Sequence, residues 1–442
     1  MVIRTQILYW TRDTIISVGG MRILSLIIPF ICLPIILANV GAHILGQFYL
    51  VFSIISILGF LDLGIPNVLL NRMAHVQEDL GARREEEKIV YDSVHSLKLV
   101  GLITTIGISL LTWFLPLNNI FKLSSEEIQE FKVCVVLSVI SLFLKFLGNL
   151  GLKVLAFNDR YRTSQVLENM SMAMGYLIAA VLTFYQNNLL IVIISVISCP
   201  AIIVLGFTYK ALFAVRHHRS SNNVEKKNRF LKLGQLNFLF IYLQFTTILM
   251  VQVDSLIVGS TLTTSQVSTL NFSWKFFSIP YLIIVSVYGY IWVDASKIKE
   301  LSKALEFFKL VMHVTKKLFY VSLFFTLLIF FAGQRIISAW TKGVVPTKLF
   351  CLAAGIWLCM LCVAYPITMM LNGMRITGYL IVTATLNMLV NFSASVILTS
   401  QLNDPAGVLL GSAIGQVMGF FIPFYFFFIR HDGFKNRLKN VA

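Results

Sequence analysis

The segment LLIVIISVISCPAIIVLGFTY (189–209) contains no charged residue. An α-helix needs about 20 such residues to cross the roughly 30 Å hydrocarbon core of a bilayer. Backbone amides have no water partners in lipid, so the spanning segments must be helices. Eleven other apolar runs have a similar length: 17–39, 48–70, 99–116, 133–152, 169–187, 235–257, 270–293, 318–334, 349–371, 377–400 and 407–429. The sequence therefore predicts an all-α polytopic membrane protein with about twelve transmembrane helices.

The composition agrees with this fold class. Of the 442 residues, 57% are hydrophobic and only 13% are charged, whereas soluble domains carry about 25% charged residues. A net charge of +16 is also typical of proteins that bind nucleic acids. The basic residues lie in the gaps between apolar runs, however, and no nucleic-acid-binding motif accompanies them. We therefore expect no nucleic-acid partner and attribute the basic residues to membrane topology.

The distribution of Lys and Arg predicts the orientation of the chain. With the N-terminus in the cytoplasm, 30 Lys and Arg residues fall in inner segments and five in outer segments. Cytoplasmic loops of membrane proteins carry such an excess of positive charge. The pattern predicts a multi-pass protein with both termini in the cytoplasm.

The polar stretch RHHRSSNNVEKKNR (216–229) divides the chain into halves with six apolar runs each. We expect a six-helix bundle over 1–215, a cytoplasmic linker over 216–234 and a second six-helix bundle over 235–442. An even number of spans in each half makes the bundles parallel repeats.

Each half also has a long charged segment after its second run, at 71–98 and at 294–317. The second segment places Ile298, Leu305 and Met312 at helical spacing. This spacing predicts an amphipathic helix on the inner membrane surface.

No constellation of catalytic residues is recognisable, so we expect neither an enzyme nor catalytic residues. The sequence has no P-loop, which excludes ATP as the energy source of this chain. Cys359 and Cys362 form a C-x-x-C pair inside an apolar run, without the second pair or the histidine of a zinc site. We expect no metal site and no resident cofactor.

Charged residues within the apolar runs are the candidate functional residues: Arg22, Asp62, Lys145, Asp254 and Lys275. A charge near the bilayer centre costs about 2.5–3.5 kcal/mol on the insertion scale, and it marks a functional position by default. Two roles remain open for Asp254 and Lys275, because they could pair with each other or contact a ligand.

Polar residues at helical spacing form stripes on three of the predicted helices. Such a stripe lines a cavity or makes hydrogen bonds to a neighbouring helix. Three separate stripes favour a cavity. They comprise Ser138, Ser141, Lys145 and Asn149; Thr383, Asn387, Asn391 and Ser395; and Asn237, Gln244, Thr247 and Asp254.

Three segments carry a family resemblance: LANVGAHILGQFYLVFSIISILGFLDLGIPNVLLNRMA (37–74), with Asp62 and Arg72; LAFNDRYR (155–162); and VDSLIVGSTLTTSQVSTLNFSWKFFSIP (253–280). Together with the six-plus-six layout, they resemble Wzx-type polysaccharide lipid flippases. These belong to the multidrug/oligosaccharidyl-lipid/polysaccharide (MOP) exporter superfamily. The resemblance implies two MATE-like bundles in the bacterial inner membrane.

The resemblance also implies a substrate, an undecaprenyl-diphosphate-linked oligosaccharide that is flipped by alternating access. The product would be O-antigen, capsule or exopolysaccharide, and the partners would be membrane lipid, a polysaccharide polymerase and a chain-length regulator. Arg22, Arg72, Lys145 and Lys275 would offset the diphosphate charge. Asn149, Asn387 and Asn391 on the polar stripes would bind sugar hydroxyls. A proton or sodium gradient would drive transport through Asp62 or Asp254.

Two other functions compete with this one. A drug/cation antiporter of the same superfold would favour an acidic cavity, whereas the candidate charges here are balanced or basic. A polysaccharide polymerase usually has a large outer loop with arginines, whereas the predicted outer loops here are short. The chain also departs from the flippases at Ser268 and Asn271, where the family usually has glycine and tyrosine.

Overall fold

The computed structural model describes residues 2–62, 65, 66, 69, 82–157, 161–213, 234–288, 290–296, 298, 301–374 and 376–429. These residues form helices joined by short turns, and none of them forms a strand. The chain divides into two compact units, Met1–Gly234 and Gln235–Ala442.

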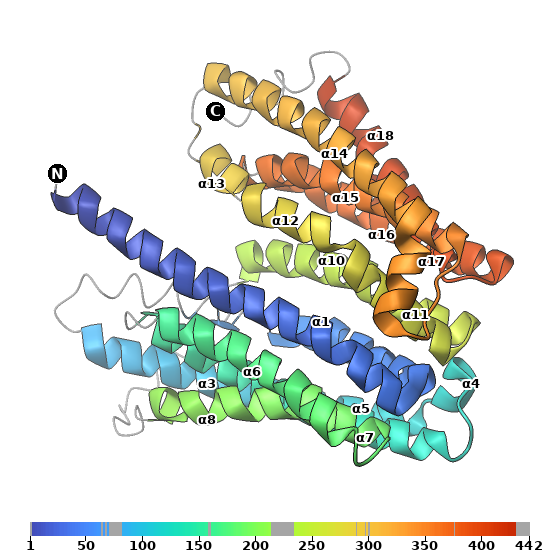
Figure 1. The fold of residues 1–442 in the computed structure, drawn as a ribbon. Coiled ribbons are helices and arrows are strands. Elements are labelled where there is room, and N and C mark those ends of the chain that lie inside the picture. The colour runs from blue at the N-terminus through green and yellow to red at the C-terminus, as the bar shows by residue number, and fades with distance from the viewer. Residues whose placement is uncertain are drawn as a thin grey trace. The chain divides into compact units, whose positions relative to one another are not determined.

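Unit 1 contains the helices α1 to α8, with one 3-10 helix (η1) and one π-helix (η3). Their bounds are α1 Val2–Leu58, η1 Gly59–Asp62, α3 Ala82–Phe114, α4 Leu117–Phe121, α5 Glu127–Leu155, α6 Tyr161–Leu182, α7 Leu189–Ile193, η3 Ile194–Ser198 and α8 Cys199–Phe213. In Figure 1, α1 (blue) and α6 (green) lie side by side, and the two helices pack against each other.

Helix α1 consists of two helical segments that meet at Gly41. The φ angle of Gly41 is 81°, outside the helical region, and glycine reaches positive φ without steric cost. The break falls between the first two predicted spans, 17–39 and 48–70. Each of these runs therefore has its own helical segment, although the segments follow one another without a loop.

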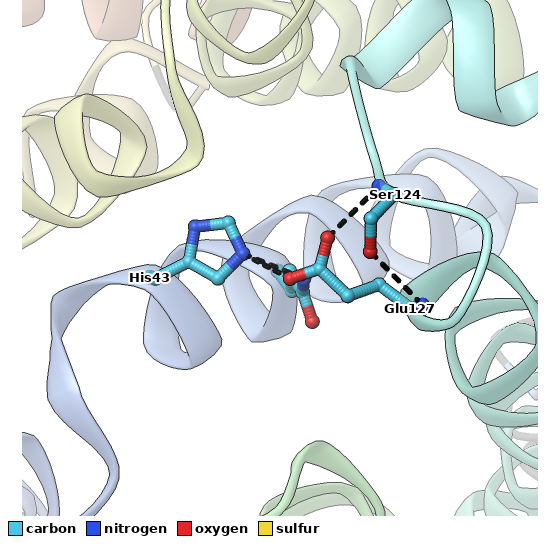
Figure 2. A network of polar contacts seen from close by, with 4 residues as sticks. His43, Ser124 and Glu127 are labelled. Carbon is cyan, nitrogen blue, oxygen red and sulfur yellow. Dashed lines mark hydrogen bonds and ion pairs between the residues drawn. The ribbon is translucent and has the colours of Figure 1, made fainter.

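A polar contact joins the second segment of α1 to the start of α5. The carboxylate of Glu127 contacts His43 Nε2 and accepts a hydrogen bond of 3.1 Å from Gln47 Nε2. Glu127 also accepts a hydrogen bond from the backbone N–H of Ser124, whose hydroxyl accepts one from the backbone N–H of Glu127. Figure 2 shows this arrangement. The reciprocal Ser124–Glu127 pair has the pattern of a capping box and stabilises the start of α5.

We predict that Glu127→Ala lowers the stability of unit 1 by about 0.5–2 kcal/mol, because it removes the capping pair and the contacts of the Glu127 carboxylate with α1. Glu126→Ala is the matched control, because Glu126 is exposed and makes no capping bond through its side chain. Thermal unfolding in detergent micelles measures the difference. Equal unfolding temperatures for the two variants would show that the contact contributes nothing.

The first polar stripe separates into two parts on α5. Ser138 and Ser141 are buried, and Ser141 donates a 2.7 Å hydrogen bond to Ser198 at the end of η3. Lys145 is exposed and Asn149 is partly buried. The first part of the stripe is therefore a helix–helix contact, and only the second part is accessible.

Unit 2 contains the helices α10 to α18 and two π-helices, η4 and η5. Their bounds are α10 Gly234–Thr261, α11 Thr264–Phe277, α12 Ile279–Tyr288, α13 Tyr290–Ser296, α14 Leu301–Thr341, α15 Lys348–Gly373, α16 Thr377–Leu402, α17 Ala406–Gln416, η4 Val417–Phe421, α18 Ile422–Phe424 and η5 Tyr425–Ile429. The predicted run 270–293 is thus divided among α11, α12 and α13.

The predicted surface helix at 294–317 does not form a separate element. Most of it is the first part of α14, a continuous helix of 41 residues. Its apolar face packs on protein, since Ala304 and Val311 are 3% and 1% exposed and belong to a core cluster with Met370 and Phe424. The apolar spacing in this segment therefore reflects packing within unit 2.

Glycines bring α17 and η4 into close contact with α16. Gly407, Gly411, Gly415 and Gly419 recur at every fourth position and so lie on one face of the last helix. A Cβ atom added to Gly411 would lie 2.3 Å from Ser395 Oγ, and one added to Gly419 would lie 2.3 Å from the backbone nitrogen of Asn387. Small residues allow such backbone contact between membrane helices.

We expect Gly411→Leu to separate α16 from α17, at a cost of about 1–3 kcal/mol or more from overpacking. Gly378→Leu is the control on α16 itself, because a Cβ at Gly378 meets no atom within 4 Å. The yield of monodisperse protein and its thermal stability in micelles distinguish the two variants. A Gly411→Leu protein as stable as Gly378→Leu would contradict the close contact.

Nine helices among the described residues are long and apolar enough to cross a membrane. One of them, Ile27–Asp62, includes the break at Gly41, and the runs at 235–257 and 270–293 lie on α10 and on α11–α13. The predicted fold class, an all-α polytopic membrane protein, is therefore confirmed.

Candidate functional site

Unit 1 contains a polar cavity of about 440 Å³. This volume lies within the range of about 300–1,000 Å³ that is common for small-molecule sites. The cavity lies where the end of η1, the last turns of α5 and the first turns of α6 meet. Its polar lining comprises Asp62, Asn149, Lys153, Ser164, Gln165 and Glu168.

Helical spacing explains why these residues converge. Asn149 and Lys153 are four residues apart on α5, and Ser164 and Glu168 are four residues apart on α6. Residues at this spacing share one face of a helix. The polar faces of α5 and α6 therefore both line the cavity.

Lys145 lies one turn before Asn149 on the same face of α5. Its side chain is exposed, and the carboxylate of Glu168 on α6 acts on it electrostatically. Asp62, Asn149 and Lys145, all predicted from the sequence, thus belong to one region of unit 1.

Sequence reasoning missed Lys153, Ser164, Gln165 and Glu168. The predicted spans 133–152 and 169–187 ended just before Lys153 and began just after Glu168, which placed these four residues between the two spans. Helix α6 extends back to Tyr161, so Glu168 lies well inside it. The signal available in the sequence was the spacing of four between Ser164 and Glu168.

A second polar cluster in unit 2 joins α10, α16 and α17. Asp254 on α10 makes a hydrogen bond with Ser412 on α17. Ser412 donates a 3.2 Å hydrogen bond to Asn391 Oδ1 on α16, which also accepts one of 2.8 Å from Ser395. One turn away, Asn387 Nδ2 donates to Gln416 Oε1 over 2.8 Å.

The hydrogen-bond inventory of this cluster constrains Asp254. A serine hydroxyl has one proton, and an ionised carboxylate only accepts hydrogen bonds. Ser412 can therefore donate to the Asp254 carboxylate or to Asn391 Oδ1, but not to both at once. The single hydroxyl proton of Ser412 thus links Asp254 on α10 with Asn391 on α16.

Asn387 and Asn391 were predicted to line a cavity, but they are only 5% and 3% exposed. They lie in the contact between α16 and α17 that the glycines create. A Cβ added to Gly415 would be 2.7 Å from Asn387 Oδ1 and 2.8 Å from Asn391 Cβ. Asn387 Nδ2 and Asn391 Oδ1 make their hydrogen bonds within the α16–α17 contact.

The remaining predicted residues take other positions. Lys275 lies in the last turn of α11 and is half-buried. Helix α11 is joined to α10 by a 3.0 Å hydrogen bond from Asn271 Nδ2 to Ser255 Oγ. Arg72 and the side chain of Arg22 lie outside the described residues. The same holds for the side chains of the third predicted stripe other than Asp254: Asn237, Gln244 and Thr247.

No protein-family model matches the sequence, and no curated protein matches it. Solved structures do match. A lipid II flippase MurJ in an inward closed conformation is 18% identical, with a TM-score of 0.71 over 93% of this chain and 86% of that one. A multidrug resistance MATE family transporter of the MOP superfamily, in an inward-facing conformation, is 11% identical, with a TM-score of 0.68 over 96% of both chains.

A MOP superfamily transporter from Pyrococcus furiosus is 12% identical, with a TM-score of 0.61 over 97% of this chain and 96% of that one. At these identities the likeness concerns the fold. The solved structures are transporters and flippases, and each match extends over nearly the whole chain. The protein is therefore a polytopic helical membrane protein with the fold shared by MurJ and the MATE transporters.

Proposed function

We propose that the protein flips an undecaprenyl-diphosphate-linked oligosaccharide across the bacterial inner membrane by alternating access. The product would supply O-antigen, capsule or exopolysaccharide synthesis, together with a polysaccharide polymerase and a chain-length regulator. The observation that carries this proposal is the polar, charged cavity within the spanning helices of unit 1. The MurJ match supports it, because the name of that protein describes the flipping of a lipid.

Physical chemistry supports such a cavity in a flippase. A diphosphate sugar cannot cross hydrocarbon unaided, since each buried charge and unpaired polar group costs several kcal/mol. Side chains in the cavity replace the water that the head group loses, while the lipid tail stays in the bilayer. Lys145 and Lys275 are the described cations that we assign to the diphosphate, and Arg22 and Arg72 are assigned the same role.

We further propose that a proton or sodium ion drives the cycle through Asp254. Its uptake or release would reorganise the bonds that join Asp254, Ser412 and Asn391. These residues lie on α10, α17 and α16, so one binding event reaches three helices. An ion shifts a conformational equilibrium only if it binds one conformation more tightly than the other. A change in the hydrogen bonds between these three helices would provide that difference in affinity.

Deleting the gene in its source organism tests the proposal. The expected result is loss of surface polysaccharide with accumulation of lipid-linked repeat units that remain accessible only from the cytoplasm. Complementation with the intact gene restores display. Normal polysaccharide display in the deletion strain, with no redundant flippase, would contradict the proposed function.

A drug/cation antiporter is the second candidate. Two carboxylates, Asp62 and Glu168, line the cavity in unit 1 and could bind an organic cation. The MATE matches also favour it. Lys153 in the same lining and the neighbouring Lys145 oppose it, because they balance the two negative charges. Export of cationic dyes by proteoliposomes that contain the protein would establish this function instead.

A further inference from the structure

The break in α1 is held on both sides by side chains that bond to other helices of unit 1. Before the break, Asn39 Nδ2 donates a 3.1 Å hydrogen bond to Thr183 Oγ1, just after the end of α6. After the break, His43 and Gln47 both contact the Glu127 carboxylate at the start of α5. These contacts connect the two segments of α1 to the helices beside them.

The strength of the contact between His43 and Glu127 depends on protonation. The Nε2 atom of His43 faces a carboxylate oxygen of Glu127, and the pair is hydrogen-bonded when Nε2 carries a proton. A neutral imidazole can supply this proton, but the imidazolium adds a positive charge. Charge-assisted hydrogen bonds are roughly twice as strong as neutral ones. The side chain of His43 is 48% exposed, so protons reach it from water.

The carboxylate side of the pair keeps its charge while a histidine titrates. Histidine changes its charge between about pH 5 and 8, and glutamate ordinarily does so near pH 4. Glu127 also accepts hydrogen bonds from Gln47 Nε2 and from the backbone N–H of Ser124, and such bonds favour the ionised form. His43 and Ser124 approach the carboxylate from different sides (Figure 2). His43 is therefore the partner whose charge changes.

Other titratable side chains occur near the start of α5: Lys122, Glu126, Glu130 and Lys132. Glu130 accepts a 3.1 Å hydrogen bond from a backbone N–H at the start of α7. Lys132 donates one of 3.2 Å to a backbone oxygen at the end of α3. Glu127 is the carboxylate that contacts His43.

We infer that His43 and Glu127 form a pH-sensitive latch, which fastens the second segment of α1 to the start of α5 more tightly as the pH falls. Protonation of His43 adds the charge that strengthens the contact, and deprotonation leaves a neutral hydrogen bond. The extra stabilisation is complete at acid pH and is lost as the pH rises through the titration of His43. The latch does not depend on which substrate the protein carries.

Hydrogen–deuterium exchange of the full-length protein in nanodiscs tests the latch. Backbone amides in peptides that cover residues 42–50 report how often this part of α1 opens locally. Exchange is measured at about pH 5.5 and about pH 7.5, and each rate is divided by the chemical exchange rate at that pH. The wild type is compared with His43→Gln and Glu127→Gln. His95→Gln is the control, because His95 is an exposed histidine on α3 whose ring stacks on Tyr91.

We expect corrected exchange over residues 42–50 to be about two- to fivefold slower at the lower pH in the wild type, the range typical of an exposed ion pair. The control should keep this ratio, whereas His43→Gln and Glu127→Gln should both bring it close to one. Unchanged exchange elsewhere in unit 1 verifies that the variants are folded. A wild-type ratio of one would overturn the latch. A ratio that survives in His43→Gln or in Glu127→Gln would also overturn it, because another group would then be responsible for the pH dependence.

Discussion

Replacing Asp254 with asparagine is expected to reduce gradient-driven transport by at least about a hundredfold. The amide keeps the size of the side chain and its hydrogen bond with Ser412, so the helices should stay packed. It cannot take up a proton, and it lacks the charge that attracts a cation. Initial rates of substrate translocation in proteoliposomes, with and without an imposed proton or sodium gradient, measure the effect.

The control for Asp254→Asn is Glu306→Gln, which neutralises an exposed carboxylate on α14 of the same unit. It should transport at the wild-type rate. Unfolding temperatures of both proteins in micelles verify that they are folded. If Asp254→Asn transported at the wild-type rate and responded to the gradient as before, Asp254 would not be the coupling residue.

The second large effect is expected from Lys145→Ala, which should reduce transport by about tenfold or more. The substitution removes a cation from the region of the cavity and one positive neighbour of the Glu168 carboxylate. An imbalance of charge between membrane helices is costly. Surface polysaccharide display in a complemented deletion strain measures the loss, with protein levels compared by immunoblot. Lys316→Ala, which removes an exposed lysine from α14, is the control.

The double variant Lys145→Ala with Glu168→Gln separates two roles of Lys145. If Lys145 only balances the charge of Glu168, the double variant should recover most of the lost transport. If Lys145 also contacts the diphosphate, the loss should persist. A double-mutant cycle measures this coupling directly. Normal display with Lys145→Ala alone would count against any role of Lys145 in transport.

The fold class could be predicted from the sequence because lipid imposes a simple requirement on the chain. Every apolar run of about 20 residues must be helical if it crosses the bilayer. The segment 189–209 is the clearest example, because it contains no charged residue. Breaks within helices are less visible in the sequence. In the run 270–293, Pro280 lies in the first turn of α12, but a proline can either kink a membrane helix or divide it, so the sequence did not predict the three helices α11, α12 and α13. The helical turns at Gly41 likewise follow one another so closely that no loop marks the end of the first span.

The orientation of a polar stripe could not be predicted from its spacing. Ser138 and Asn149 belong to one stripe on α5, yet Ser138 is buried and Asn149 lines a cavity. Spacing identifies the residues that share one face of a helix. The element that packs against this face determines whether the face is buried or accessible to water. On α16 the partner is a helix with a glycine at every fourth position. Reading Gly407, Gly411, Gly415 and Gly419 together with Asn387 would have indicated a tight dry contact.

Amphipathic spacing in the segment 294–317 had a similar ambiguity. Lys309 and Lys316 are exposed on α14, while Ala304 and Val311 pack into the core of unit 2. The sequence contains the same pattern whether the apolar face meets lipid or protein. The burial of Ala304 and Val311 in the core cluster decides between the two, and it is a property of the folded unit.

Translocation of a lipid-linked glycan by the purified protein tests the central claim most directly. Proteoliposomes are prepared with a polyprenyl diphosphate oligosaccharide in both leaflets, and a membrane-impermeant glycosidase is added outside. With the wild-type protein and an imposed ion gradient, the digested fraction should rise beyond the outer-leaflet share toward complete digestion. Digestion that stops at the outer-leaflet share, as in protein-free liposomes, would contradict the proposed flippase.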